Sequence, residues 1–160
     1  MTQYWLFKSE PDEYGIDDLA AESNGIGVWD GIRNYQARNL LRDEVKEGDQ
    51  VFFYHSSCKQ VGIAGTMQVV RAGYPDPAQF DQSSKYFDSK ASEQKPRWYC
   101  VDVRFEQKFS RVIALSELKE LAAESGSPLS DMVLLNQSRL SIQPVSKPQW
   151  NYIMALAQQS

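Results

Sequence analysis

The stretch "GDQVFFYHSSCKQVGIAG", residues 48–65, decides the fold. Behind its opening Gly-Asp turn signal, residues 50–56 are rich in aromatic and β-branched side chains and predict a strong strand. A second strand is expected over 61–75, after the connection "SCKQ", so the two segments predict a hairpin or meander. Gly62 and Gly65 inside the second strand indicate a bulge or a tight bend, as small β-barrels require.

Elements of both kinds are expected on either side of this hairpin. The pattern predicts extended segments at 2–9, 25–32 and 97–109. It predicts helices at 16–22, 34–44 and 117–124, and a last helix that Ser146 caps and Pro148 opens. Ser116 is expected to cap the third of these helices, and residues 75–96 to form a long polar loop with one helical turn. This mixture predicts one α+β domain over residues 1–160, with a curved sheet or a small barrel.

The length and net charge of the chain limit the classes of function that it can have. With 160 residues, 42% of them hydrophobic, the chain can bury about 70% of its unfolded surface and needs no disulfide or metal to fold. Its net charge of −4 argues against a protein that coats nucleic acid nonspecifically. Residues 85–111 hold seven basic against four acidic side chains, which allows a locally basic face, although such runs are commonly just solvated surface.

The chain carries no sign of export or of a membrane span. Lys8 and Glu10 interrupt the first apolar run, and no stretch is long and apolar enough to cross a bilayer. Cys58 and Cys100 are its two cysteines. We therefore expect two free thiols, a reducing cytoplasmic location and no membrane partner.

The sequence gives little indication of a catalytic site or a metal site. One histidine and two distant cysteines cannot supply a structural zinc site, so no metal or cofactor is expected. His55 adjoins Ser56, but strand alternation sends these side chains to opposite faces, which favours an ordinary strand-end residue over a catalytic base. Glu10 lies between a strand end and Pro11, in a rigid turn that suits a site and a structural role equally well. A protein without enzymatic activity is favoured.

Residues 29–43, "WDGIRNYQARNLLRD", allow two interpretations. In the first, Trp29 and Tyr35 cap the core of an amphipathic helix while three arginines lie in solvent. In the second, an aromatic plane stacks on a nucleobase, polar groups bond its edge and arginines hold phosphates. The residues alone leave both open.

Five segments together resemble the EVE domain family in order and spacing. They are "YWLFKSEPDEYGIDDL", "WDGIRNYQARN", "GDQVFFYHSSCKQVGIAG", "RWYCVDVRF" and "RLSIQPVSKPQWNYI". The resemblance implies a PUA-like fold, a small bent β-barrel with surrounding helices, and kinship with YTH, ASCH and SRA-type domains. It also implies a module that recognises a modified nucleobase without catalysis. The expected partner is a nucleic acid carrying that base, a modified cytosine in DNA, with RNA as the alternative.

The resemblance, matched position by position, also implies a site. The base pocket would comprise Ser9, Glu10, Trp29, Gly31, Asn34, Tyr35, Asn39, Tyr54, His55, Ser56, Leu135 and Leu140. Phosphates would be held by Lys8, Arg33, Arg38, Lys59 and Arg139. In this view Trp29 is the wall on which the base stacks. Two alternatives stay open: an enzyme acting on nucleic acid or nucleotides through Glu10 or His55, and a module that binds free nucleosides or another small molecule.

Overall fold

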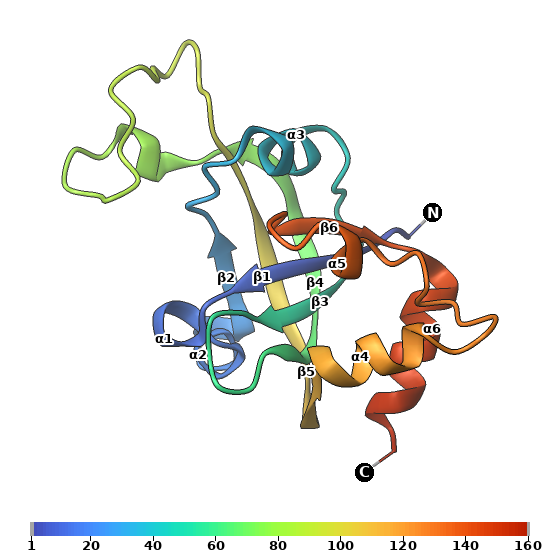
Figure 1. The fold of residues 1–160 in the computed structure, drawn as a ribbon. Coiled ribbons are helices and arrows are strands. Elements are labelled where there is room, and N and C mark those ends of the chain that lie inside the picture. Colours follow the sequence, from blue (N-terminus) through green and yellow to red (C-terminus); the bar gives the residue numbers. More distant parts are fainter. Residues whose placement is uncertain (1, 160) are drawn as a thin grey trace.

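Six strands form one mixed sheet with helices packed around it in the computed structural model, which describes residues 2–159 (Figure 1). The strand order is β2-β5-β4-β3-β1-β6; β1 and β3 pair in parallel, and all other neighbours are antiparallel. The strands are β1 (Tyr4–Ser9), β2 (Ile26–Trp29), β3 (Gln50–His55), β4 (Gly62–Pro75), β5 (Tyr99–Ala114) and β6 (Ile142–Val145). The sheet is not closed, since β2 and β6 are its two edges.

The helices lie in the connections between strands. They are α1 (Pro11–Tyr14), α2 (Ile16–Ala20), α3 (Tyr35–Asp43), α4 (Leu115–Ala122), α5 (Val133–Asn136) and α6 (Lys147–Ala157), with 3₁₀ turns η1 (Ser23–Gly25) and η2 (Pro77–Phe80). Ser146 caps α6 as predicted, through a capping box with Gln149. The prediction that Ser116 caps α4 is wrong, because α4 begins at Leu115. The backbone N–H of Leu115 already pairs with Val61 O at 3.0 Å, where β5 runs directly into the helix.

The predicted hairpin of β3 and β4 is confirmed, and its two glycines explain how the sheet bends. A Cβ atom at Gly62 would collide with the carbonyl oxygen of Ile113, and one at Gly65 with that of Gln107, both on β5. The pairing of β4 with β5 shifts register between Ile63 and Gly65. Only glycine lets the backbones approach this closely, so these two positions permit the first of several irregularities in this pairing.

Both faces of the sheet are covered. Successive residues of β1 and β3 alternate between two hydrophobic clusters: Phe7 and Phe53 pack in one, Leu6 and Phe52 in the other. The first cluster includes side chains of α2 and α3, and the second includes side chains of α4 and α6. The parallel strands β1 and β3 both end on the side where α1 and α2 lie (Figure 1).

Candidate functional site

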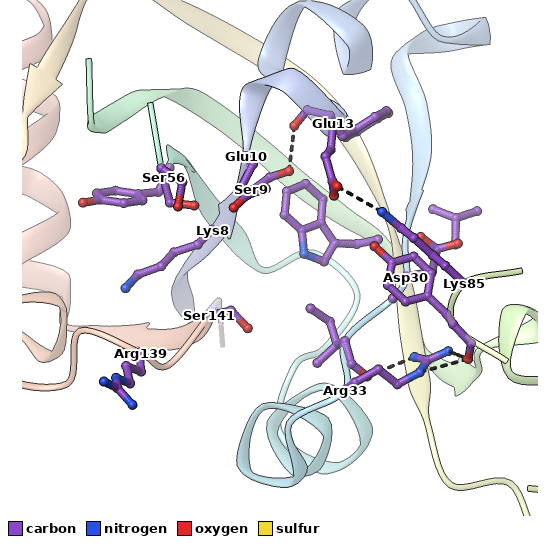
Figure 2. A pocket seen from close by; sticks show the side chains of 18 of the residues that line it. Lys8, Ser9, Glu10, Glu13, Asp30, Arg33, Ser56, Lys85, Arg139 and Ser141 are labelled. Atoms are coloured by element: carbon purple, nitrogen blue, oxygen red, sulfur yellow. Dashed lines mark hydrogen bonds and ion pairs between the residues drawn. The ribbon is translucent and has the colours of Figure 1, made fainter. Parts of the chain in front are cut away.

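A cavity of about 940 Å³ opens where β1, β2 and β3 end. Five segments far apart in the chain contribute to it: the end of β1 with α1, the end of β2 with the loop after it, the turn after β3, the long loop before β5, and the segment before β6. Figure 2 shows ten of the side chains that line this cavity, labelled. These are Lys8, Ser9, Glu10, Glu13, Asp30, Arg33, Ser56, Lys85, Arg139 and Ser141.

Trp29, the last residue of β2, contributes an aromatic surface to the cavity. Its side chain is 5% exposed and is held by three rings. The ring centroids of Phe7 and Phe53 lie 5.5 and 5.1 Å from that of Trp29, and Tyr14 meets it edge-on at 6.3 Å. This packing fixes the indole in one orientation, so it is a rigid part of the cavity's inner surface.

Basic groups at the cavity's edge are tied to other parts of the chain. Lys8 Nζ donates to Ser138 O at 2.6 Å and lies 5.6 Å from the ring centroid of Tyr54, and burial lowers the pKa of Lys8. Lys85 Nζ lies 3.0 Å from Glu13 Oε1, an ion pair between the long loop and α1. These contacts connect the segments that surround the cavity.

The lining is rich in carboxylates: Glu10, Glu13, Glu22 and Asp30. Burial raises the pKa of Asp30, and Asp76 raises it further. Tyr14 also lines the cavity, and its hydroxyl is buried beside the Glu22 carboxylate without a hydrogen bond of standard geometry among residues 2–159. Burial, with the Glu22 and Asp18 carboxylates, raises the pKa of Tyr14 to about 12. The hydroxyl is therefore a protonated donor at neutral pH.

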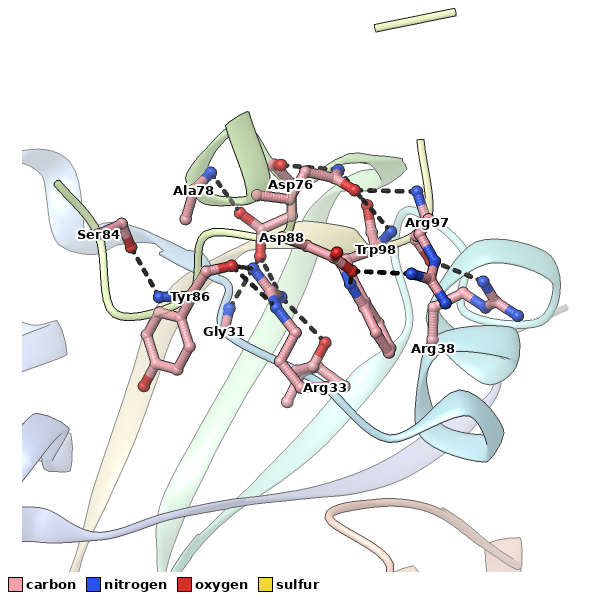
Figure 3. A network of polar contacts seen from close by, with 12 residues as sticks. Gly31, Arg33, Arg38, Asp76, Ala78, Ser84, Tyr86, Asp88, Arg97 and Trp98 are labelled. Atoms are coloured by element: carbon pink, nitrogen blue, oxygen red, sulfur yellow. Dashed lines mark hydrogen bonds and ion pairs between the residues drawn. The ribbon is translucent and has the colours of Figure 1, made fainter. Parts of the chain in front are cut away.

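The buried carboxylate of Asp76 organises the loop after β2 (Figure 3). Asp76 Oδ2 accepts from Gly31 N at 2.9 Å and from Arg33 Nη1 at 3.0 Å, while its Oδ1 accepts from Ala78 N at 2.8 Å. Arg33 also donates through Nε and Nη2 to Tyr86 O, at 3.2 and 2.7 Å. The guanidinium thus joins two loops across one side of the cavity.

Gly31 is required by this arrangement. Its φ is +76°, a conformation that side chains with a Cβ atom rarely adopt. A Cβ atom here would also lie 2.7 Å from Cζ of the Tyr86 ring. Gly31 therefore lets the loop after β2 pack closely against the long loop before β5.

The model of the EVE domain matches residues 3–156 of the chain. The chain belongs to the EVE domain family. Thymocyte nuclear protein 1 of Danio rerio is 44% identical over 164 residues, covering 95% of this chain and 71% of the relative. The crystal structure of the human THYN1 protein in complex with 5-methylcytosine containing DNA matches with a TM-score of 0.94 and 40% identity, over 99% of both chains. A YTH domain from Zygosaccharomyces rouxii, 15% identical, shares the fold with a TM-score of 0.52 over 98% of this chain and 87% of its own.

The comparisons confirm two expectations and correct one. The family resemblance and the α+β, PUA-like fold are confirmed. The predicted cytoplasmic location is contradicted, because the curated relatives carry the name thymocyte nuclear protein 1. No helix among residues 2–159 is long and apolar enough to cross a membrane.

The EVE domain brings together about half of the residues that the resemblance implied for its site. Nine of them line the cavity: Lys8, Ser9, Glu10, Trp29, Gly31, Arg33, Tyr54, Ser56 and Arg139. The others lie elsewhere. Leu135 and Leu140 pack in the hydrophobic clusters, and the side chain of Asn34 caps α3 by accepting from Ala37 N at 2.9 Å.

Three further residues lie on the outer side of α3. Tyr35 and Asn39 are exposed, and Arg38 donates to Arg97 O at 2.6 Å and to Asn39 Oδ1 at 2.8 Å. None of the three is among the residues that line the 940 Å³ cavity. They form a surface of their own beside it.

His55 and Lys59 line a second cavity, of about 780 Å³, on the other side of β3. His55 Nε2 accepts a hydrogen bond from Ile16 N at 3.1 Å, and burial lowers the pKa of His55. Strand alternation thus separates His55 from Ser56, as expected. Glu10 lines the first cavity, so the two residues considered as acid and base face different cavities.

Sequence reasoning missed several lining residues and the carboxylate behind them. They are Glu13, Tyr14, Glu22, Asp30, Asp76, Lys85, Tyr86, Ser138 and Ser141. For Asp76 the turn sequence "YPDP" was a usable signal, since aspartate next to proline commonly accepts local backbone bonds. The other positions carried no local signal, because only the fold brings them to the cavity.

Two further groups bear on chemistry. Among residues 2–159 there is no cluster of three or more His, Cys, Asp or Glu able to hold a metal ion. Cys58 and Cys100 are both free, and burial raises the pKa of the Cys100 thiol to about 12.

Proposed function

We propose that this EVE domain binds DNA by taking one modified cytosine into the 940 Å³ cavity, without catalysing a reaction on it. The observation that carries the proposal is the match over the whole chain to the human THYN1 protein in complex with 5-methylcytosine containing DNA. The cavity lies within the range of about 300–1,000 Å³ that small-molecule sites occupy. A base with its sugar fits such a space.

The inner surface of the cavity suits a flat ligand with an apolar substituent. Trp29 supplies a rigid aromatic surface, and base–aromatic stacking contributes about 1–3 kcal/mol per base. Val28 and Ile32 line the cavity on either side of Trp29 in sequence. Such apolar side chains can contact a 5-methyl group, the feature that thymine and 5-methylcytosine share.

The carboxylates favour cytosine over thymine. Cytosine presents its exocyclic amino group as a donor, whereas thymine presents a carbonyl oxygen there. Among the four lining carboxylates, Glu13 is paired with Lys85, but Glu10 and Asp30 have no ion-pair partner among residues 2–159. A carboxylate accepts from an amino group and repels a carbonyl oxygen. We assign Asp30, beside Trp29, the role of accepting from the cytosine amino group.

The free energy needed to flip a base out of a duplex decides whether the domain prefers single-stranded or double-stranded DNA. Flipping a paired base out of a duplex costs a few kcal/mol. A small domain with a net charge of −4 gains little from nonspecific phosphate attraction. Binding is therefore weaker to a fully paired duplex than to the same strand unpaired, and weaker in the absence of the modification.

Filling the cavity tests this function. Ser56→Phe places a ring in the 940 Å³ cavity, and Ser116→Phe, its matched control, places one in the 780 Å³ cavity. We expect Ser56→Phe to weaken binding of a fluorescent single-stranded oligonucleotide with one 5-methylcytosine at least tenfold in an anisotropy titration, and Ser116→Phe to leave it unchanged. Equal affinity of both variants would refute the proposal, and tighter binding of the same sequence as RNA would refute the choice of DNA.

A further inference from the structure

Aromatic rings and guanidinium groups alternate along one side of the EVE domain, from the cavity to the outer side of α3. Arg33 Cζ lies 5.3 Å from the ring centroids of both Tyr86 and Trp98. Arg38 Cζ lies 6.0 Å from the Trp98 centroid and 4.9 Å from that of Tyr35. Arg97 Cζ lies 5.8 Å from the Tyr35 centroid. We call this row the guanidinium ladder; its members are Tyr86, Arg33, Trp98, Arg38, Tyr35 and Arg97. Figure 3 labels all of them except Tyr35.

The inner end of the ladder belongs to the cavity. Arg33 and Tyr86 are among its lining residues, and Arg33 is neutralised there by the buried carboxylate of Asp76. Hydrogen bonds to Tyr86 O and Ile32 O hold the guanidinium in place. Arg33 and Tyr86, at the inner end of the ladder, are therefore held rigidly in place.

The outer end is open to solvent and carries charge. Tyr35 is 48% exposed, yet its ring is ordered by stacking on Trp98, with centroids 4.9 Å apart. Arg97 contacts the Tyr35 hydroxyl and pairs with Asp88 at 3.3 Å. Arg38 has no carboxylate within ion-pair distance among residues 2–159. Half of the eight arginines of this acidic chain lie on or next to this face: Arg33, Arg38, Arg42 and Arg97.

An exposed, pre-ordered aromatic ring between guanidinium groups is what a flexible nucleic-acid strand requires. Its bases stack on aromatic rings regardless of sequence, and its phosphates accept hydrogen bonds from arginine. Arg38 has no carboxylate partner among residues 2–159. A bound phosphate would supply the missing negative charge.

We infer that the surface of Tyr35, Arg38 and Arg97 binds the strand that flanks the base in the cavity, with a neighbouring base against the exposed part of Tyr35 and Arg38 on a phosphate. This inference rests on the proposed function, because the ladder leads from the cavity that holds the base. It identifies the occupant as a stretch of the same DNA strand next to the recognised cytosine.

Two ligands and a salt series test the inference. One ligand is a single-stranded oligonucleotide with one 5-methylcytosine; the other is 5-methyl-2′-deoxycytidine, which occupies the cavity alone. We expect Arg38→Gln to weaken oligonucleotide binding several-fold and to reduce the slope of log affinity against log salt by about 0.7, the single-strand value for one phosphate. Nucleoside affinity should stay unchanged, because the nucleoside has no phosphate. Tyr35→Ser should weaken only the oligonucleotide as well.

Arg104→Gln is the matched control, since Arg104 is exposed on β5, away from both the cavity lining and the ladder. An unchanged affinity and salt slope in Arg38→Gln would overturn the inference while leaving the proposed function intact. An equal loss for both ligands would also overturn it, because it would reveal damage to the cavity. Failure of wild type to bind either ligand would overturn the proposed function and the inference together.

Discussion

At the scale of single residues, Trp29 and Arg38 separate the two interpretations of the segment 29–43. Trp29 is almost fully buried by three rings and still contributes to the cavity's inner surface, so both interpretations apply to it in part. Arg33 lines the cavity and donates to Asp76 and Tyr86 within the protein, and its contact with a phosphate stays a prediction. Arg38 lies outside the cavity, and its charge has no carboxylate partner in the described part of the chain, residues 2–159. Spacing along a helix cannot distinguish such environments, because they depend on the distant loop around Asp76.

Tyr14→Phe tests the lining at this scale. The Tyr14 hydroxyl is buried and makes no hydrogen bond of standard geometry among residues 2–159, and an unsatisfied buried polar group costs about 1–3 kcal/mol. We expect the variant to be at least as stable as wild type in urea unfolding. Because the hydroxyl has almost no accessible surface, its removal should leave the affinity for a methylated oligonucleotide unchanged.

Tyr74→Phe provides the comparison, because the Tyr74 hydroxyl donates to Asp102 at 2.6 Å and Tyr74 does not line the cavity. That variant should lose stability and keep its affinity. A clearly destabilised Tyr14→Phe variant would contradict this expectation, because it would show that the hydroxyl stabilises the fold.

At the scale of elements, short sequence patterns correctly predicted the features that depend on neighbouring residues, such as hairpins and helix caps. The β3–β4 hairpin, the glycines that bend it and the Ser146 cap all follow from short-range rules. The long loop before β5 was expected to be irregular, and it is, yet it is held by buried Gln79, which accepts from Arg97 N and Trp98 N at 2.9 Å. Hydrogen bonds between residues some 18 positions apart leave no periodic signal in the sequence.

His55 links two elements, β3 and α2, and makes stability depend on pH. Its neighbours are Asp17 and Lys108, but burial dominates and lowers its pKa below the ordinary 6.5. As pH falls through 6.5, the unfolded chain therefore binds the proton before the folded protein does. The free energy of unfolding should decrease from that pH downward and be fully retained above it.

His55→Gln isolates this effect, since a glutamine oxygen can still accept from Ile16 N but does not titrate. Urea unfolding between about pH 7.5 and pH 5 should show wild type losing more stability than the variant. Parallel curves for the two proteins would contradict the assignment to His55.

At the scale of the whole molecule, the cavity is a product of topology. Segments from between residues 8 and 141 meet where β1, β2 and β3 end. The resemblance to the EVE family predicted this fold and about half of the lining, because family motifs record which segments meet. The acidic character of the lining could not be read in the same way. Glutamates and aspartates at turns also favour helix starts, and their side chains acquire a common environment only in the folded chain.

One measurement tests the central claim most directly: anisotropy titration of three single-stranded DNAs that differ only in one base, 5-methylcytosine, cytosine or thymine. Burial of one methyl group contributes about 0.8 kcal/mol, so 5-methylcytosine should bind about fourfold more tightly than cytosine. A base-edge contact contributes about 1–3 kcal/mol of discrimination, so thymine should bind about tenfold more weakly than 5-methylcytosine or worse. Asp30→Asn should reduce this second difference, and Asp12→Asn, which changes an exposed aspartate outside the cavity, should not. Equal affinity for all three DNAs would contradict the account.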